Sequence, residues 1–276
     1  MIYNSSTGDN MEKYNVRFKK RYGQNFLKSS SIVKRIVSVS GVDKDSLVIE
    51  VGPGGAIMTR ELALKAGAVL AYEIDSDLAP ELDNKLADFD NVDIVYQDFL
   101  LADIASDVSN YSYKKIFFVS NVPYYITTPI ILKLLSSGIS FENIVMMVQK
   151  EVGDRFTSTC GTKDYGSIAV YLQYYYCIKK EFFVSRKEFV PEPKVDSVII
   201  SFLENKNRPM LKSEQFFEIV VRDSFQYRRK TIRNNLKKYD LDIVRKVLSE
   251  YNFDLNVRAE MLPVDCFVKL ANALWK

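Results

Sequence analysis

The stretch Val48-Ile49-Glu50-Val51-Gly52-Pro53-Gly54-Gly55-Ala56 decides the fold predicted for this chain. Four residues typical of a β-strand run into a glycine-rich turn, and residues 58–66 have the pattern of a helix. Glycines at such a turn let the backbone approach a ligand, and the first N–H groups of the helix are free to bind it. The spacing is G-x-G-G rather than the complete G-x-G-x-x-G dinucleotide fingerprint. The turn therefore predicts a binding site without naming its ligand.

Two further predicted strands also end at acidic residues. Residues 69–72 lead to Glu73, about twenty residues after Gly52, where an acidic residue binds ribose hydroxyls in dinucleotide folds. Residues 92–96 lead to Asp98, whose carboxylate can accept a hydrogen bond from an adenine amino group. Each acid alone has the simpler interpretation of a solvated residue at a strand end. Three polar strand ends in succession favour one shared site.

The tetrapeptide Asn121-Val122-Pro123-Tyr124 is the second informative stretch. It follows a strand-like run at 116–119 and precedes a helix-like run at 128–135. The Asn121 side-chain oxygen and the Pro123 carbonyl can accept hydrogen bonds from an exocyclic amine, and the Tyr124 ring can stack on a base. By itself the tetrapeptide is equally typical of a turn at a strand end. The glycine-rich turn upstream favours the binding interpretation.

Composition excludes several classes of enzyme. The 276 residues include no histidine and three cysteines without a C-x-x-C spacing. Ser-His-Asp hydrolysis and histidine zinc sites are thereby excluded, and we expect free thiols in a reducing compartment and no metal. Residues 1–10 are polar and lack the apolar core of a signal peptide, and no run of eighteen apolar residues occurs. We expect a cytoplasmic protein with a disordered tail over residues 1–17, for which Met11 is an alternative start.

Charge is distributed unevenly along the chain. Residues 1–38 carry eight Lys/Arg and two acidic residues, a net charge of +6. Residues 39–204 carry fifteen Lys/Arg and twenty-four acidic residues, a net charge of −9. Residues 205–276 carry fifteen Lys/Arg and nine acidic residues, a net charge of +6. Basic ends around an acidic centre favour a polyanion bound on both sides of a central site, although surface lysines also serve solubility. The basic segment around Lys19, Lys20 and Arg21 includes aromatic residues, which suits phosphates and stacked bases.

The pattern of elements predicts two domains. Strands and helices alternate from residue 47 to about 148, which indicates an α/β fold with a parallel sheet covered by helices on both faces. A proline-containing loop over 189–197 leads to a last strand at 198–202, and the boundary falls between residues 204 and 205. Helices are expected at 213–225, 230–238, 240–251 and 263–274. The second of these would place Arg228, Arg229, Lys230 and Arg233 as a basic stripe near one helix face. Tyr174-Tyr175-Tyr176 could be a stacking surface, but core packing is the better interpretation.

Five segments together resemble the N6-adenine rRNA dimethyltransferases. They are Gly23-Gln24-Asn25-Phe26-Leu27, Glu50-Val51-Gly52-Pro53-Gly54, Asn121-Val122-Pro123-Tyr124, Phe189-x-Pro191-x-Pro193-Lys194-Val195-Asp196-Ser197 and Arg228-Arg229-Lys230-Thr231-Ile232-Arg233-Asn234. The superfamily has a small-subunit, ribosome-biogenesis (KsgA-type) branch and a large-subunit, macrolide-resistance (Erm-type) branch. Lys163-Asp164-Tyr165-Gly166 with Gln173-Tyr174-Tyr175, Asp196 and the basic segment favour the small-subunit branch. Val122 departs conservatively from the usual Leu or Ile.

The resemblance implies a function and a set of site residues. The fold would be the class I methyltransferase sheet, mostly parallel with one antiparallel strand near its edge. Residues 1–204 would form the catalytic domain and 205–276 a helical rRNA-binding domain. The substrate would be two adjacent adenosines in the 3′-terminal hairpin loop of small-subunit rRNA, each methylated twice at N6 by a monomer acting on a pre-30S particle. The implied ligands of S-adenosylmethionine are Asn25, Leu27, Gly52, Gly54, Glu73, Asp98 and Asn121. Asn121, Pro123, Tyr124 and Phe189 are the implied catalytic residues, with Tyr124 and Phe189 stacking on the base.

Overall fold

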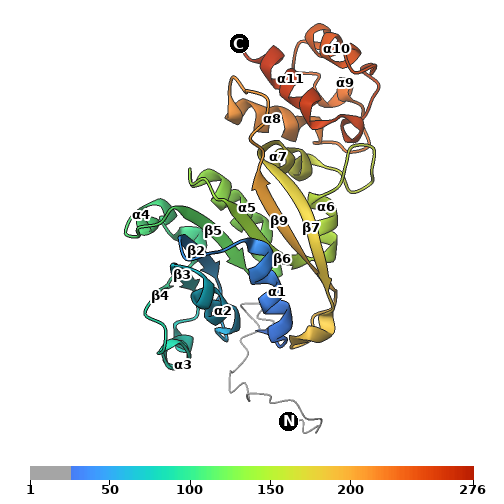
Figure 1. Ribbon diagram of the computed structural model, residues 1–276. Coiled ribbons are helices and arrows are strands. Elements are labelled where there is room, and N and C mark those ends of the chain that lie inside the picture. Colours follow the sequence, from blue (N-terminus) through green and yellow to red (C-terminus); the bar gives the residue numbers. More distant parts are fainter. Residues whose placement is uncertain (1–25) are drawn as a thin grey trace.

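A seven-stranded β-sheet is the centre of the computed structural model, which describes residues 26–276 (Figure 1). The strands lie in the order β4-β3-β2-β5-β6-β9-β7. Their bounds are β2 Ser46–Val51, β3 Ala68–Glu73, β4 Val92–Tyr96, β5 Lys115–Ser120, β6 Asn143–Gln149, β7 Tyr176–Val184 and β9 Ser197–Glu204. The predicted α/β sheet is confirmed. The tail expected over residues 1–17, and Lys19, Lys20, Arg21 and Asn25, lie outside the described residues.

The sheet is parallel except for β9, which runs antiparallel to both of its neighbours, β6 and β7. This is the antiparallel strand near the edge that the resemblance implies. From β4 at one edge the chain returns to the middle of the sheet, where β5 pairs with β2. The order of the strands therefore reverses between β2 and β5. In open α/β sheets, ligands bind at the carboxyl ends of the strands at such a switch point.

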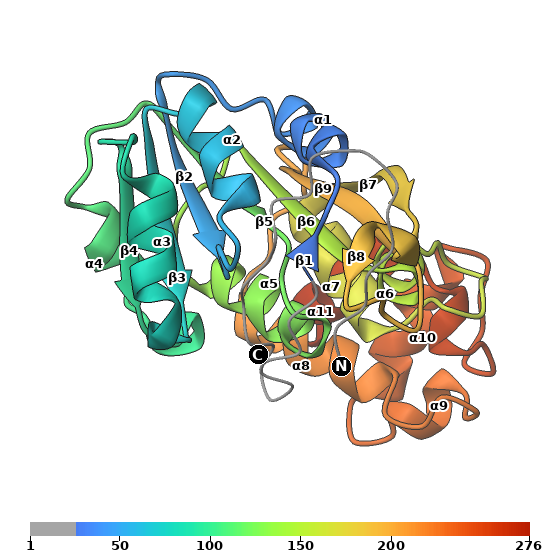
Figure 2. The same ribbon diagram turned by 90° about the horizontal axis from the view of Figure 1, so that it is seen from below.

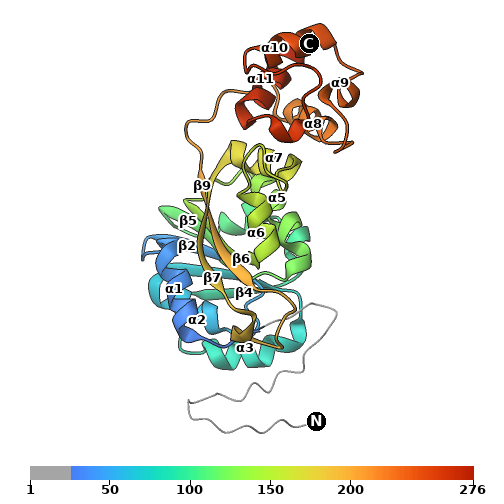
Figure 3. The ribbon, with the colours of Figure 1, turned by 90° about the vertical axis from the view of Figure 1, so that its right-hand side faces the viewer.

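Helices cover both faces of the sheet, because alternate strand residues point to opposite sides. On one face, Val48 and Phe117 pack in a cluster with Val33 and Leu62, from α1 and α2. The other face packs against the helices α4 to α7. Figure 3 shows α1 and α2 on one side of the sheet and α5 and α6 on the other. The bounds are α1 Ser30–Ser40, α2 Ile57–Lys65, α3 Ala79–Leu86, α4 Ile104–Val108, α5 Thr127–Ser136, α6 Lys150–Phe156 and α7 Ser167–Tyr175.

Two short strands and several 3₁₀-helices complete this part of the chain. Strand β1, Phe26–Leu27, pairs with β8, Phe189–Val190, so the start of the described chain lies beside the proline-containing loop (Figure 2). The 3₁₀-helices of this part are η2 Ser76–Leu78, η3 Phe99–Leu101, η4 Tyr124–Ile126 and η5 Arg186–Glu188, and η6 Ala259–Met261 lies in the C-terminal part. Among residues 26–276, no helix is both long and apolar enough to span a membrane.

The C-terminal helices form a second cluster at one end of the sheet (Figure 1). They are α8 Glu214–Ser224, α9 Ile232–Asn235, α10 Leu241–Ser249 and α11 Val264–Leu274. Tyr165, Val170 and Tyr174 also belong to their core, so α7 packs against both the sheet and the helical cluster. Tyr174 and Tyr176 are buried, which confirms core packing for them. The expected boundary after residue 204 coincides with the end of β9 in sequence, but the helical core also includes one face of α7.

The helix expected over residues 230–238 is wrong, because α9 contains only Ile232–Asn235. The backbone N–H groups of Ile232 and Arg233 donate to the carbonyl groups of Val257 and Leu255, at 2.8 and 3.0 Å, in a loop distant in sequence. The buried Asn235 side chain also binds Ser224 O at 2.6 Å and the N–H of Tyr227 at 3.2 Å, which shapes the turn before α9. The basic residues therefore occupy a turn, a short helix and a second turn rather than one helix face.

A substitution at Gly153 tests how closely α6 packs on the sheet. A Cβ atom at this position would lie 2.4 Å from Val198 Cγ1 and 3.5 Å from Val148 Cγ2, so there is no room for a methyl group. We expect Gly153→Ala to lower the free energy of unfolding by about 1–3 kcal/mol, the usual range for overpacking a core. Gly166→Ala is the matched control, because a Cβ atom there meets nothing within 4 Å. Equal urea midpoints for the two variants would contradict this account of the α6 contact.

Candidate functional site

At the switch point, the hydroxyl of a serine replaces the backbone hydrogen bonds between β2 and β5. The β2–β5 ladder ends at Ile49 and Phe118. Beyond it, the Val51 N–H donates to Ser120 Oγ at 3.2 Å, and the Ser120 hydroxyl donates to Val51 O at 2.6 Å. Ser120 is buried, so these bonds satisfy the strand end away from water. The two strands separate here, and the segments that follow them form the walls of a cavity.

The glycine-rich turn forms one wall of this cavity. Gly52 and Gly54 have φ values of 74° and 52°, in the left-handed region that favours glycine. The Gly54 N–H donates to Glu73 Oε2 at 3.2 Å, and the Asp75 N–H donates to Glu73 Oε1 at 2.9 Å. The Glu73 carboxylate therefore connects the ends of β2 and β3. A carboxylate has about four acceptor positions, so lone pairs remain for a ligand.

The cavity has a volume of about 300 Å³ and joins all of the predicted strand ends. Leu27, Gly52, Gly54, Glu73, Asp98 and Asn121, the described members of the predicted cofactor set, all line it. Asp98 also caps η3, since its Oδ1 accepts the Leu100 N–H at 2.9 Å. The prediction from sequence did not include Glu50, Met58 and Tyr72, which line it as well. Their side chains are apolar or buried, so the pattern of polar strand ends could not reveal them.

Glu50 is the unusual member of this lining. It is 1% exposed and borders the cavity, and its Oε2 has no hydrogen-bond partner among residues 26–276. Burial raises the pKa of Glu50 to about 8, the neighbouring Thr59 hydroxyl acts in the opposite direction, and the negative charge of Glu73 adds to the rise. Burial also raises the pKa of Glu73. Two carboxyl groups on neighbouring strands thus border the same cavity, and burial favours the neutral form of each.

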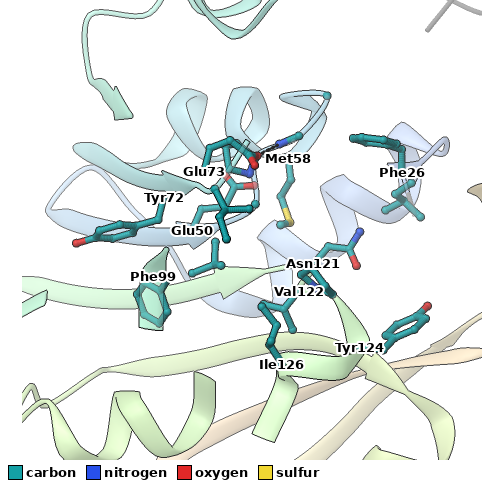
Figure 4. A pocket seen from close by; sticks show the side chains of 18 of the residues that line it. Phe26, Glu50, Met58, Tyr72, Glu73, Phe99, Asn121, Val122, Tyr124 and Ile126 are labelled. Carbon is teal, nitrogen blue, oxygen red and sulfur yellow. Dashed lines mark hydrogen bonds between the residues drawn. The ribbon is translucent and has the colours of Figure 1, made fainter. Parts of the chain in front are cut away.

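Asn121, Pro123 and Tyr124 form the opposite wall, at the end of β5 (Figure 4). Figure 4 shows Asn121 and Tyr124 at the same end of the pocket as Phe26, with Tyr72 and Phe99 at the other end. The Pro123 carbonyl accepts the Ile126 N–H at 3.1 Å and retains a second lone pair. The three groups predicted to recognise an exocyclic amine and its ring therefore line one cavity.

Tyr124 is held by a residue of another motif. Its hydroxyl lies 2.7 Å from Ser197 Oγ, and Ser197 is the first residue of β9 and fully buried. Burial raises the pKa of the Tyr124 phenol, and the nearby Asp196 acts in the same direction. The segment 189–197, expected from the sequence as a proline-containing loop and as one of the motifs that resemble the family, thus supplies the hydrogen-bond partner of Tyr124.

The structure does not place Phe189 at the cavity, which corrects its expected stacking role. Phe189 is 2% exposed and packs in a core cluster with Leu27 and Val184. Its backbone pairs with Leu27 in the two-stranded β1–β8 sheet. The ring is therefore part of the support beneath β1. Besides Tyr124, the aromatic residues that line the cavity among those described are Phe26, Tyr72, Phe99 and Tyr125.

The predicted RNA-binding residues of the C-terminal helices are exposed, but they are not equivalent. Arg228 donates a hydrogen bond to Lys163 O, and its Nε lies 3.8 Å from Glu260 Oε2. Glu260 O in turn accepts the Gly161 N–H at 2.7 Å. Arg228 therefore fastens the 161–166 loop to the helical cluster. Within residues 26–276, the structure shows no hydrogen bond or ion pair for the side chains of Arg229, Lys230 and Arg233, which remain available to phosphates.

The described residues contain no group of three or more Cys, Asp or Glu side chains arranged to hold a metal ion. Cys160, Cys177 and Cys266 are free thiols, as expected from sequence.

Comparison with known proteins identifies the family. A family described as "Ribosomal RNA adenine dimethylase" matches residues 15–276. The chain belongs to this family. It is 42% identical over 273 residues to the "Ribosomal RNA small subunit methyltransferase A" of Streptococcus gordonii. This alignment covers 96% of this chain and 94% of the relative. The protein of the same name from Bacillus cereus is also 42% identical, over 97% of this chain and 95% of its own.

Solved structures agree with this assignment. The crystal structure of the 23S rRNA methyltransferase ErmE is 28% identical, with a TM-score of 0.70 over 90% of this chain and 99% of that one. A dimethyladenosine transferase from Plasmodium falciparum is 23% identical, with a TM-score of 0.75 over 89% and 95% of the two chains. The second likeness shows the fold alone. Together they confirm the class I methyltransferase sheet with its C-terminal helices.

Glu50 gives a prediction for stability against pH. With an unfolded pKa of 4.5 and a folded pKa of about 8, the neutral carboxyl stabilises the fold fully below pH 4.5, and this contribution is lost as pH rises to about 8. Glu50→Gln keeps the shape and cannot ionise. We expect its free energy of unfolding relative to the parent protein to rise between pH 4.5 and 8 by on the order of 4 kcal/mol.

The measurement is urea unfolding of both proteins at several pH values without ligand. A pH-independent difference between them would show that Glu50 is not a buried neutral acid.

Proposed function

We propose that this protein transfers methyl groups from S-adenosylmethionine to N6 of two adjacent adenosines in the 3′-terminal hairpin loop of small-subunit rRNA. Each adenosine receives two methyl groups. The observation that carries the proposal is the placement of Asn121, Pro123 and Tyr124 around one cavity with Glu73 and Asp98. The choice of the small subunit is supported by the 42% identity to small-subunit methyltransferases, against 28% to the 23S rRNA enzyme.

The cavity suits the chemistry of the cofactor. The buried Glu50 oxygen without a partner and the Glu73 and Asp98 carboxylates give it an acidic lining. Such a lining suits a cationic ligand with ribose hydroxyls and an adenine amino group. Glu73 at the end of β3 is the candidate for the ribose, and Asp98 after β4 for the adenine amino group. When bound, S-adenosylmethionine supplies an electrophilic methyl group from its sulfonium. Leu27, Gly52 and Gly54 would border it, as would Asn25, which lies outside the described residues.

Catalysis then consists mainly of positioning. The lone pair of adenine N6 is delocalised into the ring, so the amine is a poor nucleophile. Hydrogen bonds from N6–H to Asn121 Oδ1 and the Pro123 carbonyl favour a more tetrahedral nitrogen whose lone pair faces the methyl group. The carbon–sulfur bond breaks as the carbon–nitrogen bond forms, and the nitrogen loses a proton to water. A neutral Asn leaves one acceptor in place after the first methylation, which permits the second.

The ring of Tyr124 stacks on the target adenine after this base has left the RNA base stack. Its ring lies at the cavity, and Ser197 fixes the phenol end of the ring. Phe189 has no stacking role in the proposal, because it lies in the core.

The partner is small-subunit rRNA within a pre-30S particle. The protein binds it as a monomer, and binding requires neither a metal ion nor a membrane. Arg229 and Lys230, in the turn before α9, and Arg233, in α9, provide exposed cations. Lys19, Lys20 and Arg21 would provide a second basic segment. Small-subunit assembly in a bacterium takes place in the cytoplasm, which is where we place the reaction.

The deciding experiment measures methyl transfer from labelled S-adenosylmethionine to purified 30S particles and to protein-free 23S rRNA, both lacking the modification. N6,N6-dimethyladenosine near the 3′ end of 16S rRNA is the expected result. Product on 23S rRNA alone would make the protein a resistance-type enzyme. Binding of the cofactor without product on either RNA would leave an RNA-binding assembly factor.

Variants at Tyr124 and Ser197 distinguish the contribution of ring stacking to catalysis from that of the hydrogen bond between the two side chains. Tyr124→Ala is expected to lower kcat/KM by about 10- to 100-fold, because a base–aromatic stack is worth about 1–3 kcal/mol. Tyr124→Phe and Ser197→Ala remove the same hydrogen bond and keep the ring, so both should lower kcat/KM by only about 3- to 10-fold. A Phe variant as impaired as the Ala variant would refute the stacking role.

Arg228 and Arg229 form a second matched pair. Arg229→Ala should weaken rRNA binding without changing the melting temperature. It should also reduce the slope of the logarithm of the binding constant against the logarithm of the salt concentration by about 1. Arg228→Ala should also lower the melting temperature, because it removes the hydrogen bond to Lys163 O. Binding is measured by titration at several salt concentrations. An unchanged slope for Arg229→Ala would remove this turn from the RNA footprint.

A further inference from the structure

Glu50 borders the cavity yet has no role in the structure that explains its burial. A buried carboxyl group normally has hydrogen-bond partners for both oxygens, because burying an unpaired polar atom is costly. Within residues 26–276, Glu50 Oε2 has no hydrogen bond of normal geometry, and neither has the fully buried hydroxyl of Thr59 on α2, the polar side chain that acts on Glu50. Glu73 differs, because each of its oxygens accepts a backbone N–H. An unsatisfied acid in a ligand cavity indicates a group whose partner arrives with the ligand.

Within residues 26–276, no cation acts on Glu50 in the empty cavity. Among the described groups, those that act on Glu50 are Thr59 from α2 and the carboxylate of Glu73 from β3. From β5, Ser120 binds the backbone of Val51, and Lys115 lies at the other end of the strand in an ion pair with Asp43. The Tyr72 hydroxyl is bound to Asp107. With a pKa of about 8, Glu50 is therefore mostly the neutral acid at pH 7 until a positive charge enters the cavity.

We propose that Glu50 is a proton-linked cofactor-binding residue, which is a carboxylic acid in the empty cavity and becomes a carboxylate when a cationic ligand enters. The inference rests on the proposed function, since it takes S-adenosylmethionine as that ligand. The O–H bond of Glu50 breaks, the proton passes to the solvent, and the carboxylate pairs with a cationic group of the ligand. Binding of the methyl donor therefore releases close to one proton at neutral pH.

This linkage bears on the exchange of cofactor for product. The donor carries a sulfonium and an α-ammonium group, whereas the demethylated product S-adenosylhomocysteine carries the α-ammonium group alone. If Glu50 pairs with the sulfonium, methyl transfer removes its partner, Glu50 regains a proton, and the product leaves more readily. If it pairs with the α-ammonium group, donor and product release equal numbers of protons. 5′-Methylthioadenosine has neither cation and should release none.

The test is calorimetric titration of the full chain in two buffers of different ionisation enthalpy at pH 6.5. At that pH the α-amino group of the ligand, with a pKa of about 7.7–8.0, is already protonated, so released protons come from the protein. We expect close to one proton released with S-adenosylmethionine and none with 5′-methylthioadenosine. The affinity for S-adenosylmethionine should rise about tenfold between pH 6 and pH 7.

Two variants assign the proton to Glu50. Glu50→Gln should bind S-adenosylmethionine more weakly at pH 7, release no proton and show no change of affinity between pH 6 and pH 7. Thr59→Val removes the neighbouring hydroxyl and keeps the acid, so the release should persist and extend to higher pH. The second variant keeps the assignment testable if Glu50→Gln does not fold.

The outcomes separate the inference from the proposed function. Binding of S-adenosylmethionine without proton release, or equal release by Glu50→Gln, would overturn the role of Glu50 and leave the methyltransferase proposal intact. Equal release with 5′-methylthioadenosine would also overturn it. Failure of the parent protein to bind S-adenosylmethionine at all would instead refute the proposed function.

Discussion

The site depends on the separation of β2 from β5 at the switch point of the sheet. A continuous backbone ladder would close the space between Gly52 and Asn121. Instead, the ladder stops at Ile49 and Phe118, and the Ser120 hydroxyl satisfies both backbone groups of Val51. Since the strand ends remain hydrogen-bonded, they can diverge without leaving buried polar groups unpaired. The cofactor wall and the base wall of the cavity are consequently formed by segments about seventy residues apart in sequence, a distance set by the crossover from β4 to β5.

Much of this arrangement follows from local sequence patterns. Strands that end in Gly52, Glu73 and Asp98 must bring these residues to one edge if the strands are parallel, and the described structure confirms that they line one cavity. Asn121 and Tyr124 follow by the same reasoning, because β5 is parallel to β2. The sequence pattern also predicted a set of C-terminal helices, whereas the antiparallel strand was expected only through the resemblance to a known family.

Other features depend on contacts between segments distant in sequence. Nothing local to Phe189 indicates that its ring packs beneath β1, and nothing local to Ser197 indicates that it binds Tyr124. The expected helix at 230–238 failed because the loop at 255–257 and the Asn235 side chain bind the backbone there. Glu50 was visible within a motif, but its burial and its unpaired oxygen depend on α2 and β3 packing around it. Tertiary hydrogen bonds, rather than intrinsic propensity, decide these cases.

The central claim is that Asn121 orients the amine that receives the methyl group. Single-turnover methylation of unmodified 30S particles by the parent protein and by Asn121→Ala, with S-adenosylmethionine affinity measured in parallel, tests it most directly. The account predicts a loss of at least about 100-fold in the methylation rate, in line with removal of a positioned hydrogen-bonding group from an active site, and a smaller loss of cofactor affinity. An Asn121→Ala protein that methylates adenosine at the parent rate would contradict it.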